Sequence, residues 1–350
     1  MAAMKRRNFL QGAVLTAPLL SSGSTLARGL ALKETKLALG YDNFAVRAMK
    51  WKAPELIDYA AKLKCDTLFI TDFGPLEKMD DGYLGDLRKK AADVGVKILL
   101  GSWSICPTSK KFRDTWGTAE EHLQLGIRAA KALGSPAFRV VLGAREDRNS
   151  EGGIEARIAD TVKVLKGSRT RCLDSGIRIA MENHAGDMHS LELRGLIEAA
   201  GPDFVGANFD SGNAVWTMED PVQALENLGK YVITTSLRDS AVWESENGFS
   251  VQWTAMGDGD TNLKTFFKRF AELCPKVAVN IETISGFNHE LKVKNDGFWK
   301  AWPKGKPKGY DKFLALAQKG KPRKAGKVDQ REDIERSIAY CKSELGLGQR

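Results

Sequence analysis

Histidine and cysteine are scarce in this 350-residue sequence, which contains four His and five Cys. The cysteines are widely spaced and none belongs to a CxxC pair, so the sequence predicts no disulfide framework. Neither a GxGxxG nor a GxxxxGK(S/T) phosphate-binding loop is present. The sequence therefore gives no support to a small disulfide-stabilised fold or to the common nucleotide-binding folds.

Long hydrophobic runs are also lacking, apart from a short apolar stretch at residues 12–20. It follows the basic segment KRRNFL at residues 5–10 and precedes a plausible cleavage site that ends at Ala27. This order is typical of a signal peptide, and the paired arginines resemble a twin-arginine signal. We predict that residues 1–27 direct export by the twin-arginine machinery, which leaves a soluble periplasmic protein. An uncleaved membrane anchor and a chance basic start are the alternatives.

Positive charge is concentrated in one segment. The formal net charge of the chain is +9, and residues 300–327 hold ten Lys or Arg but only one acid, Asp311. Because this segment alone accounts for the excess, the rest of the chain is not basic. We therefore expect no nucleic-acid partner, although the basic segment could attract phosphate or acidic polymers electrostatically.

Strand-like and helix-like segments alternate eight times along most of the chain. Such alternation over about 250 residues predicts an α/β protein with a (β/α)8 TIM barrel. A doubly wound open sheet is the alternative, and it lacks the phosphate loop that would support it. The expected strands are 36–41, 67–71, 96–101, 138–142, 177–182, 204–210, 231–236 and 277–282, and the expected helices are 54–63, 83–94, 119–133, 154–173, 191–200, 221–228 and 263–273.

The composition changes after the eighth expected strand. We expect the barrel to occupy residues 34–285 and a basic extension to follow at residues 286–327. The extension is rich in Lys, Gly and Pro, a composition that buries little apolar surface and predicts extended loops. An amphipathic pattern then predicts a final helix within residues 328–350, packed on the outside of the barrel.

Three of the expected strands end on a carboxylate: Glu182, Asp210 and Glu282. In a TIM barrel the active site lies at the carboxyl ends of the strands, so the three should meet at one mouth. Buried carboxylates are costly unless they are paired, hydrogen-bonded or bound to metal. Oxygen ligands of this kind suit a divalent ion, and the sequence therefore predicts a metal site.

The three segments resemble motifs of the xylose isomerase-like TIM-barrel superfamily, the sugar phosphate isomerase/epimerase group. Glu182-Asn183-His184 resembles the family's ENH segment, and Phe209-Asp210-Ser211-Gly212-Asn213 resembles the next one. The resemblance implies that Glu182, Asp210 and Glu282 bind Mn, Mg, Co or Zn. Where the family often has His-x-Lys-Asp on the seventh strand, this chain has Ser236-Leu237-Arg238-Asp239, so Ser236 replaces the expected histidine as a weak fourth ligand.

Other residues near the strand ends are candidates for contact with a substrate. His184 lies two residues past Glu182 and could orient substrate or transfer a proton. Polar groups at the mouth could bind substrate oxygens, and an aromatic residue there suits the face of a sugar. Arg139 and Arg145 flank the fourth strand's end and could bind substrate oxygens, although we expect surface ion pairs there. The predicted substrate-binding residues are His184, Asn213, Arg238, Asp239 and Trp103.

The resemblance implies proton abstraction next to a carbonyl or hydroxyl carbon of a sugar, with Glu182, Glu282 and His184 as catalytic residues. Export favours a free sugar, keto-sugar or glycoside over a sugar phosphate. A lyase or hydratase acting on a 3-keto-glycoside would use the same chemistry, so it stays an alternative. A non-catalytic sugar-binding protein is a third possibility because the family histidine is replaced. The few histidines disfavour a nuclease with a histidine-rich metal site.

Overall fold

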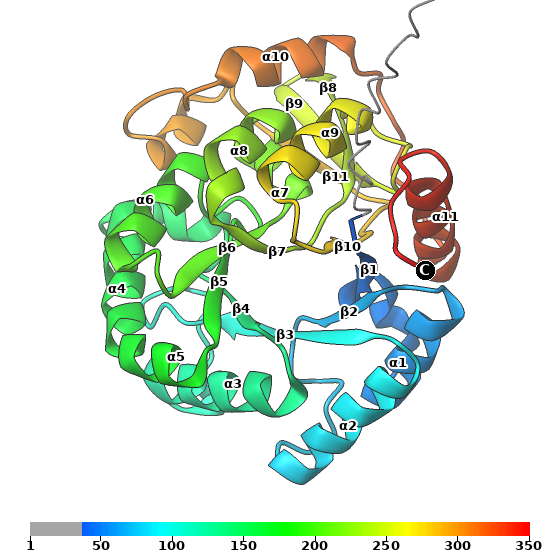
Figure 1. The fold of residues 1–350 in the computed structure, drawn as a ribbon. Coiled ribbons are helices and arrows are strands. Elements are labelled where there is room, and N and C mark those ends of the chain that lie inside the picture. Colours follow the sequence, from blue (N-terminus) through cyan, green and yellow to red (C-terminus); the bar gives the residue numbers. More distant parts are fainter. Residues whose placement is uncertain (1–36) are drawn as a thin grey trace, which may run out of the picture. The chain divides into compact units, whose positions relative to one another are not determined.

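The computed structural model describes residues 37–350, and eight parallel strands form its central barrel (Figure 1). The predicted export signal at residues 1–27 lies outside this range, as does the predicted start of the barrel at residue 34. Neighbours along the sheet are joined in the order β10-β1-β2-β3-β4-β5-β6-β7. The strands are β1 (Leu39–Asp42), β2 (Thr67–Ile70), β3 (Lys97–Ser104), β4 (Ala137–Val141), β5 (Arg178–Glu182), β6 (Val205–Phe209), β7 (Val232–Thr235) and β10 (Val279–Ile281).

The two ends of this sheet meet just beyond β7. A parallel bridge joins Leu237 to Ile281, and the Leu237 amide donates to the Asn280 carbonyl at 2.7 Å. The Glu282 amide in turn donates to the Leu237 carbonyl at 2.8 Å. These bonds bring the two strand ends that carry Arg238 and Glu282 side by side. The predicted (β/α)8 TIM barrel is confirmed.

Helices cover the outside of the barrel and follow local sequence signals. At the start of α3 (Ala119–Leu133), the Thr118 hydroxyl accepts from the Glu121 amide and the Glu121 carboxylate accepts from the Thr118 amide. The same helix ends at Gly134, whose φ of 77° suits glycine. The helices between the strands are α1 (Ala53–Lys62), α2 (Asp81–Asp93), α3 (Ala119–Leu133), α4 (Gly153–Gly167), α5 (Arg169–Ser175), α6 (Ser190–Ala200), α7 (Ser211–Trp216), α8 (Pro221–Leu228) and α9 (Leu263–Leu273).

Three of these helices correct the prediction from sequence. The expected helix 154–173 is divided into α4 and α5 at Ser168, just after Gly167, a residue that weakens a helix interior. The short helix α7 was not predicted; it begins immediately after Asp210, whose side chain accepts from the Asn213 amide. Asp210 is therefore a helix cap as well as a strand-end carboxylate.

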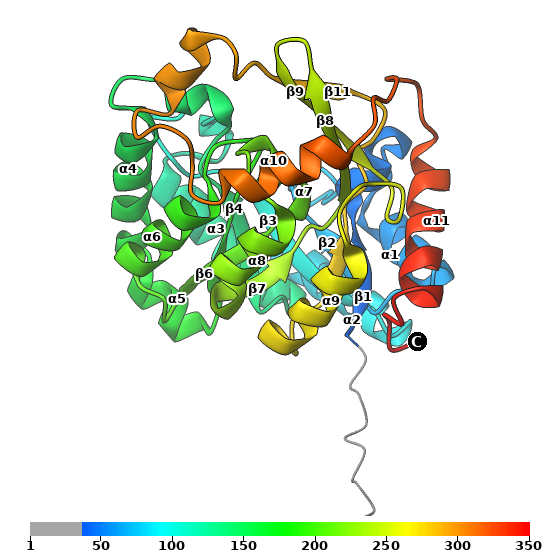
Figure 2. The same ribbon diagram turned by 90° about the horizontal axis from the view of Figure 1, so that it is seen from above.

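A second layer lies over one side of the barrel mouth (Figure 2). Strands β8 (Asp239–Ser245), β9 (Gly248–Thr254) and β11 (Asn288–Leu291) form an antiparallel sheet, against which α10 (Tyr310–Lys319) packs. The apolar residues of this layer form their own cluster, which includes Val251, Trp253 and Phe313. The expectation of extended loops throughout the basic extension is therefore wrong for α10, because its Phe313 and Ala317 are buried despite the surrounding lysines.

The final helix, α11 (Gln330–Ser343), packs beside β1 and β10 (Figure 1). Its Ile334, Ile338 and Cys341 are buried in the main core. The hydroxyl of Tyr59 on α1 donates to the Glu335 carboxylate at 3.0 Å. Helix α11 thus covers part of the outside of the barrel beside β1 and β10. Within residues 37–350, no helix combines the length and apolar character that crossing a membrane requires.

Candidate active site

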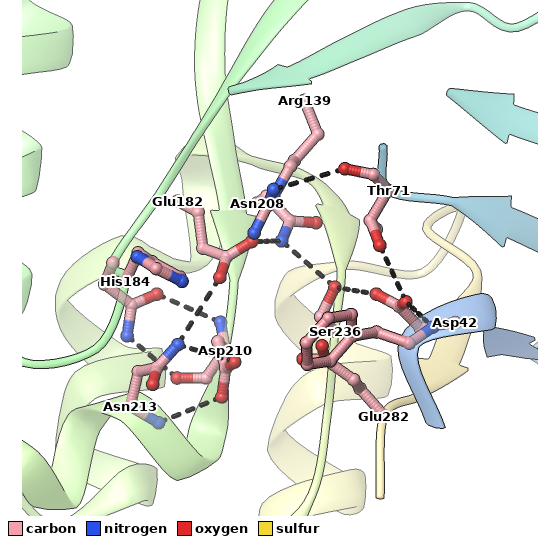
Figure 3. Close-up of polar contacts among 12 residues, drawn as sticks. Asp42, Thr71, Arg139, Glu182, His184, Asn208, Asp210, Asn213, Ser236 and Glu282 are labelled. Atoms are coloured by element: carbon pink, nitrogen blue, oxygen red, sulfur yellow. Dashed lines mark hydrogen bonds and ion pairs between the residues drawn. The ribbon is translucent and has the colours of Figure 1, made fainter. Parts of the chain in front are cut away.

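Four carboxylates gather at the carboxyl ends of the strands: Asp42, Glu182, Asp210 and Glu282 (Figure 3). All four are buried, the most accessible being Glu282 with 6% of its surface exposed. A cavity of about 650 Å³ opens above them, and Glu182 and Glu282 line it. The structure therefore brings the three sequence-predicted carboxylates into one site and adds Asp42, which was not predicted.

Glu182 is held by an arginine from the neighbouring strand. Arg139 Nε donates to Glu182 Oε2 at 2.5 Å, and Arg139 Nη1 donates to the Ser102 carbonyl at 2.7 Å. Asn208 Nδ2 donates to the same Oε2 at 2.7 Å. The second oxygen, Oε1, has only a 3.4 Å contact from Asn213 Nδ2. The expected surface ion pair of Arg139 is thus wrong, because this side chain is buried.

Asp42 and Ser236 connect the first and seventh strands. The Ser236 hydroxyl donates to Asp42 Oδ2 at 2.9 Å and accepts from Asn208 Nδ2 at 3.2 Å. Asp42 Oδ1 also accepts from the Thr71 hydroxyl at 2.9 Å. The bonds form a chain from Asp42 through Ser236 and Asn208 to Glu182 (Figure 3). The Ser236 hydroxyl is therefore already used in hydrogen bonds to Asp42 and Asn208.

Asp210 and Glu282 share one guanidinium. Arg238 Nη2 donates to Asp210 Oδ2 and to Glu282 Oε2. Asn213 supports the arrangement, because its Nδ2 donates to Asp210 Oδ2 at 2.7 Å. Asn183 lies behind them and exchanges two hydrogen bonds with the backbone of Asp210. The two carboxylates therefore meet at a buried cation from the chain itself.

His184 and Trp103, two of the predicted substrate-binding residues, form part of the cavity wall. The two rings meet edge to face, with centroids 5.3 Å apart. His184 Nδ1 lies 2.6 Å from the Gly143 carbonyl oxygen. This contact fixes the ring, and the other ring nitrogen, Nε2, takes no part in it. Asn213 and Arg238 also line the cavity. Four of the five predicted substrate-binding residues thus face one cavity.

Asp239 is the fifth, and it is directed elsewhere. Its carboxylate accepts from the amides of Ser240, Gly257 and Gly259 at 2.8–3.2 Å. It does not line the cavity that holds Glu182 and Glu282. The carboxylate orders the loop after β9, and this geometry gives no support to its predicted contact with substrate.

The electrostatics of the site divide the carboxylates into two groups. Burial raises the pKa of Asp42 to about 6 and that of Asp210 to about 7. Burial also raises the pKa of Glu282 well above its ordinary value, with the Arg238 cation opposing the effect. For Glu182, burial is outweighed by the Arg139 ion pair, so the pKa is lowered. The arrangement favours an ionised Glu182 and a protonated Glu282.

The predicted metal site does not fit this arrangement. No group of three or more His, Cys, Asp or Glu within residues 37–350 is placed to hold a metal ion. Glu182 is paired with Arg139, while Asp210 and Glu282 share Arg238. The hydroxyl proposed as a fourth ligand, that of Ser236, is bonded to Asp42. The three carboxyl groups that were assigned to a metal are thus paired with arginine side chains.

Comparison with known proteins now identifies the family. The family described as "Xylose isomerase-like TIM barrel" matches residues 57–295. The chain belongs to this family. The 3-oxo-isoapionate decarboxylase of Pectobacterium atrosepticum is 20% identical over 206 residues, which cover 58% of this chain and 67% of that protein.

Two solved structures of the family's fold are similar to this chain. A D-psicose 3-epimerase structure, obtained in the presence of D-fructose, has a TM-score of 0.59 at 15% identity and covers 89% of this chain and all of the other. The structure of the IOLI protein with a bound zinc atom has a TM-score of 0.55 at 14% identity, covering 87% of this chain and 98% of that one. At these identities the similarity shows the fold alone.

Proposed function

We propose that this protein is an enzyme that transfers a proton at the carbon next to a carbonyl group in a sugar-derived substrate, and so isomerises or epimerises it. The observation that carries the proposal is the shared cavity of Glu182 and Glu282, two buried carboxylates whose surroundings favour opposite protonation states. The epimerase and decarboxylase among the similar proteins are consistent with chemistry of this class.

The proposed base is Glu182. Its Oε2 is held by Arg139 and Asn208, whereas Oε1 has only the long contact from Asn213 and is available to accept a proton. Removal of the α-proton places negative charge on the carbonyl oxygen of the substrate. Buried N–H donors at the site would stabilise that charge. Glu282, which is favoured in its protonated form, would deliver a proton to carbon and complete the reaction.

The wall of the cavity suits a carbohydrate. Its aromatic members are Phe44, Phe73, Trp103, Trp116, Trp216 and Trp253. Aromatic faces pack against the C–H groups of a sugar, while polar side chains at the base of the cavity accept or donate hydrogen bonds. His184 lies beside Trp103, and we propose that it orients a substrate hydroxyl.

The test is a panel of free sugars, keto-sugars and glycosides, each incubated with the protein in D₂O. Deuterium should enter the product at the carbon that receives the new proton. This is the same carbon that loses its proton in an epimerisation and the neighbouring carbon in an isomerisation. Glu182→Gln and Glu282→Gln should each lower kcat by about 10²- to 10⁴-fold, while exposed Glu120→Gln should leave it unchanged. Turnover of the confirmed substrate by Glu282→Gln at the normal rate would contradict the proposal.

A specific observation also favours the lyase alternative on a keto-glycoside. A second cavity of about 400 Å³ adjoins the first, and Trp216 lines both. The Trp216 ring stacks on Trp253 with centroids 4.4 Å apart and on His289 at 3.9 Å. This aromatic row could hold the aglycone or second sugar of a glycoside.

Product mass separates the two reactions, because a lyase releases an aglycone and an isomerase does not. For a glycoside substrate, Trp216→Ala should raise KM by more than tenfold if the second cavity holds the leaving group. The same variant should change KM for a free sugar much less. Equal effects on both substrates would remove the argument for a glycoside.

A further inference from the structure

We propose that Arg238 supplies the positive charge at the centre of this site in place of a divalent ion, and that the protein folds and acts without a bound metal. The guanidinium contacts Asp210 and Glu282 together, two of the three carboxylates that the sequence assigned to a metal. Arg139 pairs with the third, Glu182. The inference concerns the charge at the site, so it stands whichever reaction is catalysed.

The site contains a space shaped for the Arg238 side chain. Gly212, in the first turn of α7, lies directly beside the Arg238 shaft, and a Cβ atom at this position would overlap Cγ and Cδ of the arginine. The Arg238 amide also donates to the Ser211 hydroxyl at 3.1 Å, while that hydroxyl donates to the Arg238 carbonyl at 2.6 Å. Backbone and side chain of Arg238 are thus both fixed by the start of α7.

Trp253 covers the other side of the guanidinium. The Arg238 Cζ atom lies 4.3 Å from the centroid of the Trp253 ring, and Trp253 Nε1 donates to the Gly212 carbonyl at 2.7 Å. The cation is therefore held between a glycine, an aromatic face and two carboxylates, and only 2% of the residue is exposed. An arginine that is enclosed to this degree is held in one conformation, unlike a mobile arginine on the surface.

Two donors of Arg238 remain available. Nε and Nη1 are buried and have no hydrogen-bond partner among residues 37–350, although Arg238 lines the cavity. Buried N–H groups are normally paired, so two unpaired donors beside a substrate cavity indicate a ligand oxygen. A guanidinium stays charged at all physiological pH values and presents its donors in a fixed plane. Arg238 can therefore bind the oxygen on which negative charge develops.

Ser236 stands at the position where a histidine was expected. The Ser236 hydroxyl both donates to Asp42 and accepts from Asn208, so it belongs to a hydrogen-bond network. An imidazole ligand is absent from this position, and a guanidinium from two residues further along the chain reaches the carboxylates instead. The Arg238 guanidinium thus lies between Asp210 and Glu282, where the sequence predicted a metal ion.

The first test measures metal directly and does not depend on activity. The full-length protein, incubated with Mn²⁺, Co²⁺, Zn²⁺ or Mg²⁺ and then desalted, should hold far less than one equivalent by mass spectrometry of the metal. Its Tm should be the same in EDTA and in 1 mM Mn²⁺. One equivalent of tightly bound metal, or a Tm increase by Mn²⁺ that Glu282→Gln abolishes, would overturn the inference.

The second test perturbs the arginine. Gly212→Ala should displace Arg238, whereas Gly195→Ala, on the exposed face of α6 with no atom in contact range of its Cβ, is the matched control. With a confirmed substrate and EDTA present, Gly212→Ala and Arg238→Ala should lower kcat by about 10²-fold or more, with smaller changes in KM. Circular dichroism shows whether each variant is folded. A folded Arg238→Ala variant with normal kcat in EDTA would refute the role of the guanidinium. Wild-type activity that EDTA abolishes and Mn²⁺ restores would show that the protein does not act without metal.

Discussion

Among single residues, Arg139 is the one whose burial has the clearest energetic consequence. It lies on β4, a strand with buried residues throughout, and its Nε atom bonds Glu182 at 2.5 Å. Removal of one partner of a buried ion pair leaves the other charge without compensation. The stability of the barrel and the ionised state of Glu182 therefore depend on the same contact.

We predict that Arg139→Leu lowers the free energy of unfolding by about 3–5 kcal/mol, the cost of an uncompensated buried carboxylate. Arg145→Ala is the matched control, because Arg145 is exposed and surface substitutions usually change stability by less than about 0.5 kcal/mol. Urea unfolding followed by circular dichroism measures both. Equal stability of the two variants would contradict the structural role of the Arg139–Glu182 pair.

Glu219 predicts a pH dependence of stability that is separate from the active site. It is fully buried and accepts from the Ser190 amide at 3.1 Å and from Asn227 at 3.0 Å. Burial raises the pKa of Glu219 from 4.5 to about 8, so the folded state favours the neutral acid. This contribution is complete below pH 4.5 and is lost as the pH rises through about 8.

The measurement compares wild type with Glu219→Gln at several pH values. The difference in unfolding free energy, wild type minus variant, should fall as the pH rises from about 4.5 to about 8. Burial lowers the pKa of His189, whose Nε2 lies 3.3 Å from Glu219, to about 4. His189 is present in both proteins, so the difference between them is assigned to Glu219. Exposed Glu120→Gln is the control variant. A constant difference for Glu219→Gln would mean that its folded-state pKa is not raised.

Among the structural elements, α10 supports the layer that carries Trp253. Phe313 is fully buried and meets Phe249 of β9 edge to face, with centroids 5.2 Å apart. Trp253, at the other end of β9, contacts the Arg238 guanidinium. A single strand thus connects the packing of the basic extension with the active site.

Phe313→Ala should destabilise the protein by about 3–5 kcal/mol, because it removes a large buried ring and leaves a cavity. We expect the variant also to raise KM for the confirmed substrate, since β9 holds Trp253 in the cavity wall. Exposed Gln318→Ala, on the same helix, is the control for both measurements. Loss of stability with no change in KM would mean that α10 does not influence substrate binding at the active site.

The sequence predicted the barrel strands well but missed the second layer. The periodic alternation of strands and helices is strong enough to place all eight barrel strands. No element was expected between residues 236 and 263, where the hairpin of β8 and β9 lies. Its signal was present: β-branched and aromatic residues on both sides of Asn247-Gly248 are typical of a hairpin. The strand β11 had no such local signal, because it pairs with β9 across a long sequence separation.

The site was predicted in part for similar reasons. Glu182, Asp210 and Glu282 end their strands, and Asp42 ends the first strand in the same way, so the same pattern could have found it. Arg139 could also have been found, because both faces of a parallel barrel strand are buried and a charge within one requires a partner. The position of Arg238 between two carboxylates required tertiary structure, since Gly212 and Trp253 come from distant segments.

For the whole molecule, the testable property is its location in the cell. The basic and apolar segments of residues 5–20 predict export by the twin-arginine machinery. Replacement of Arg6 and Arg7 by lysine should retain the protein in the cytoplasm, whereas Lys5→Arg should not. Cell fractionation followed by immunoblotting measures the distribution. Equal periplasmic amounts of the double variant and the wild type would contradict the predicted signal.

The place of α11 in the barrel has a consequence for the order in which the fold can form. The helix packs beside β1, from which nearly the whole barrel separates it in the sequence. Its Ile334, Ile338 and Cys341 are buried in the main core. Contacts between segments so distant in sequence form slowly, because the entropy cost of closing the loop comes before the gain from the contact. We therefore expect the apolar surface beneath α11 to be buried late in folding.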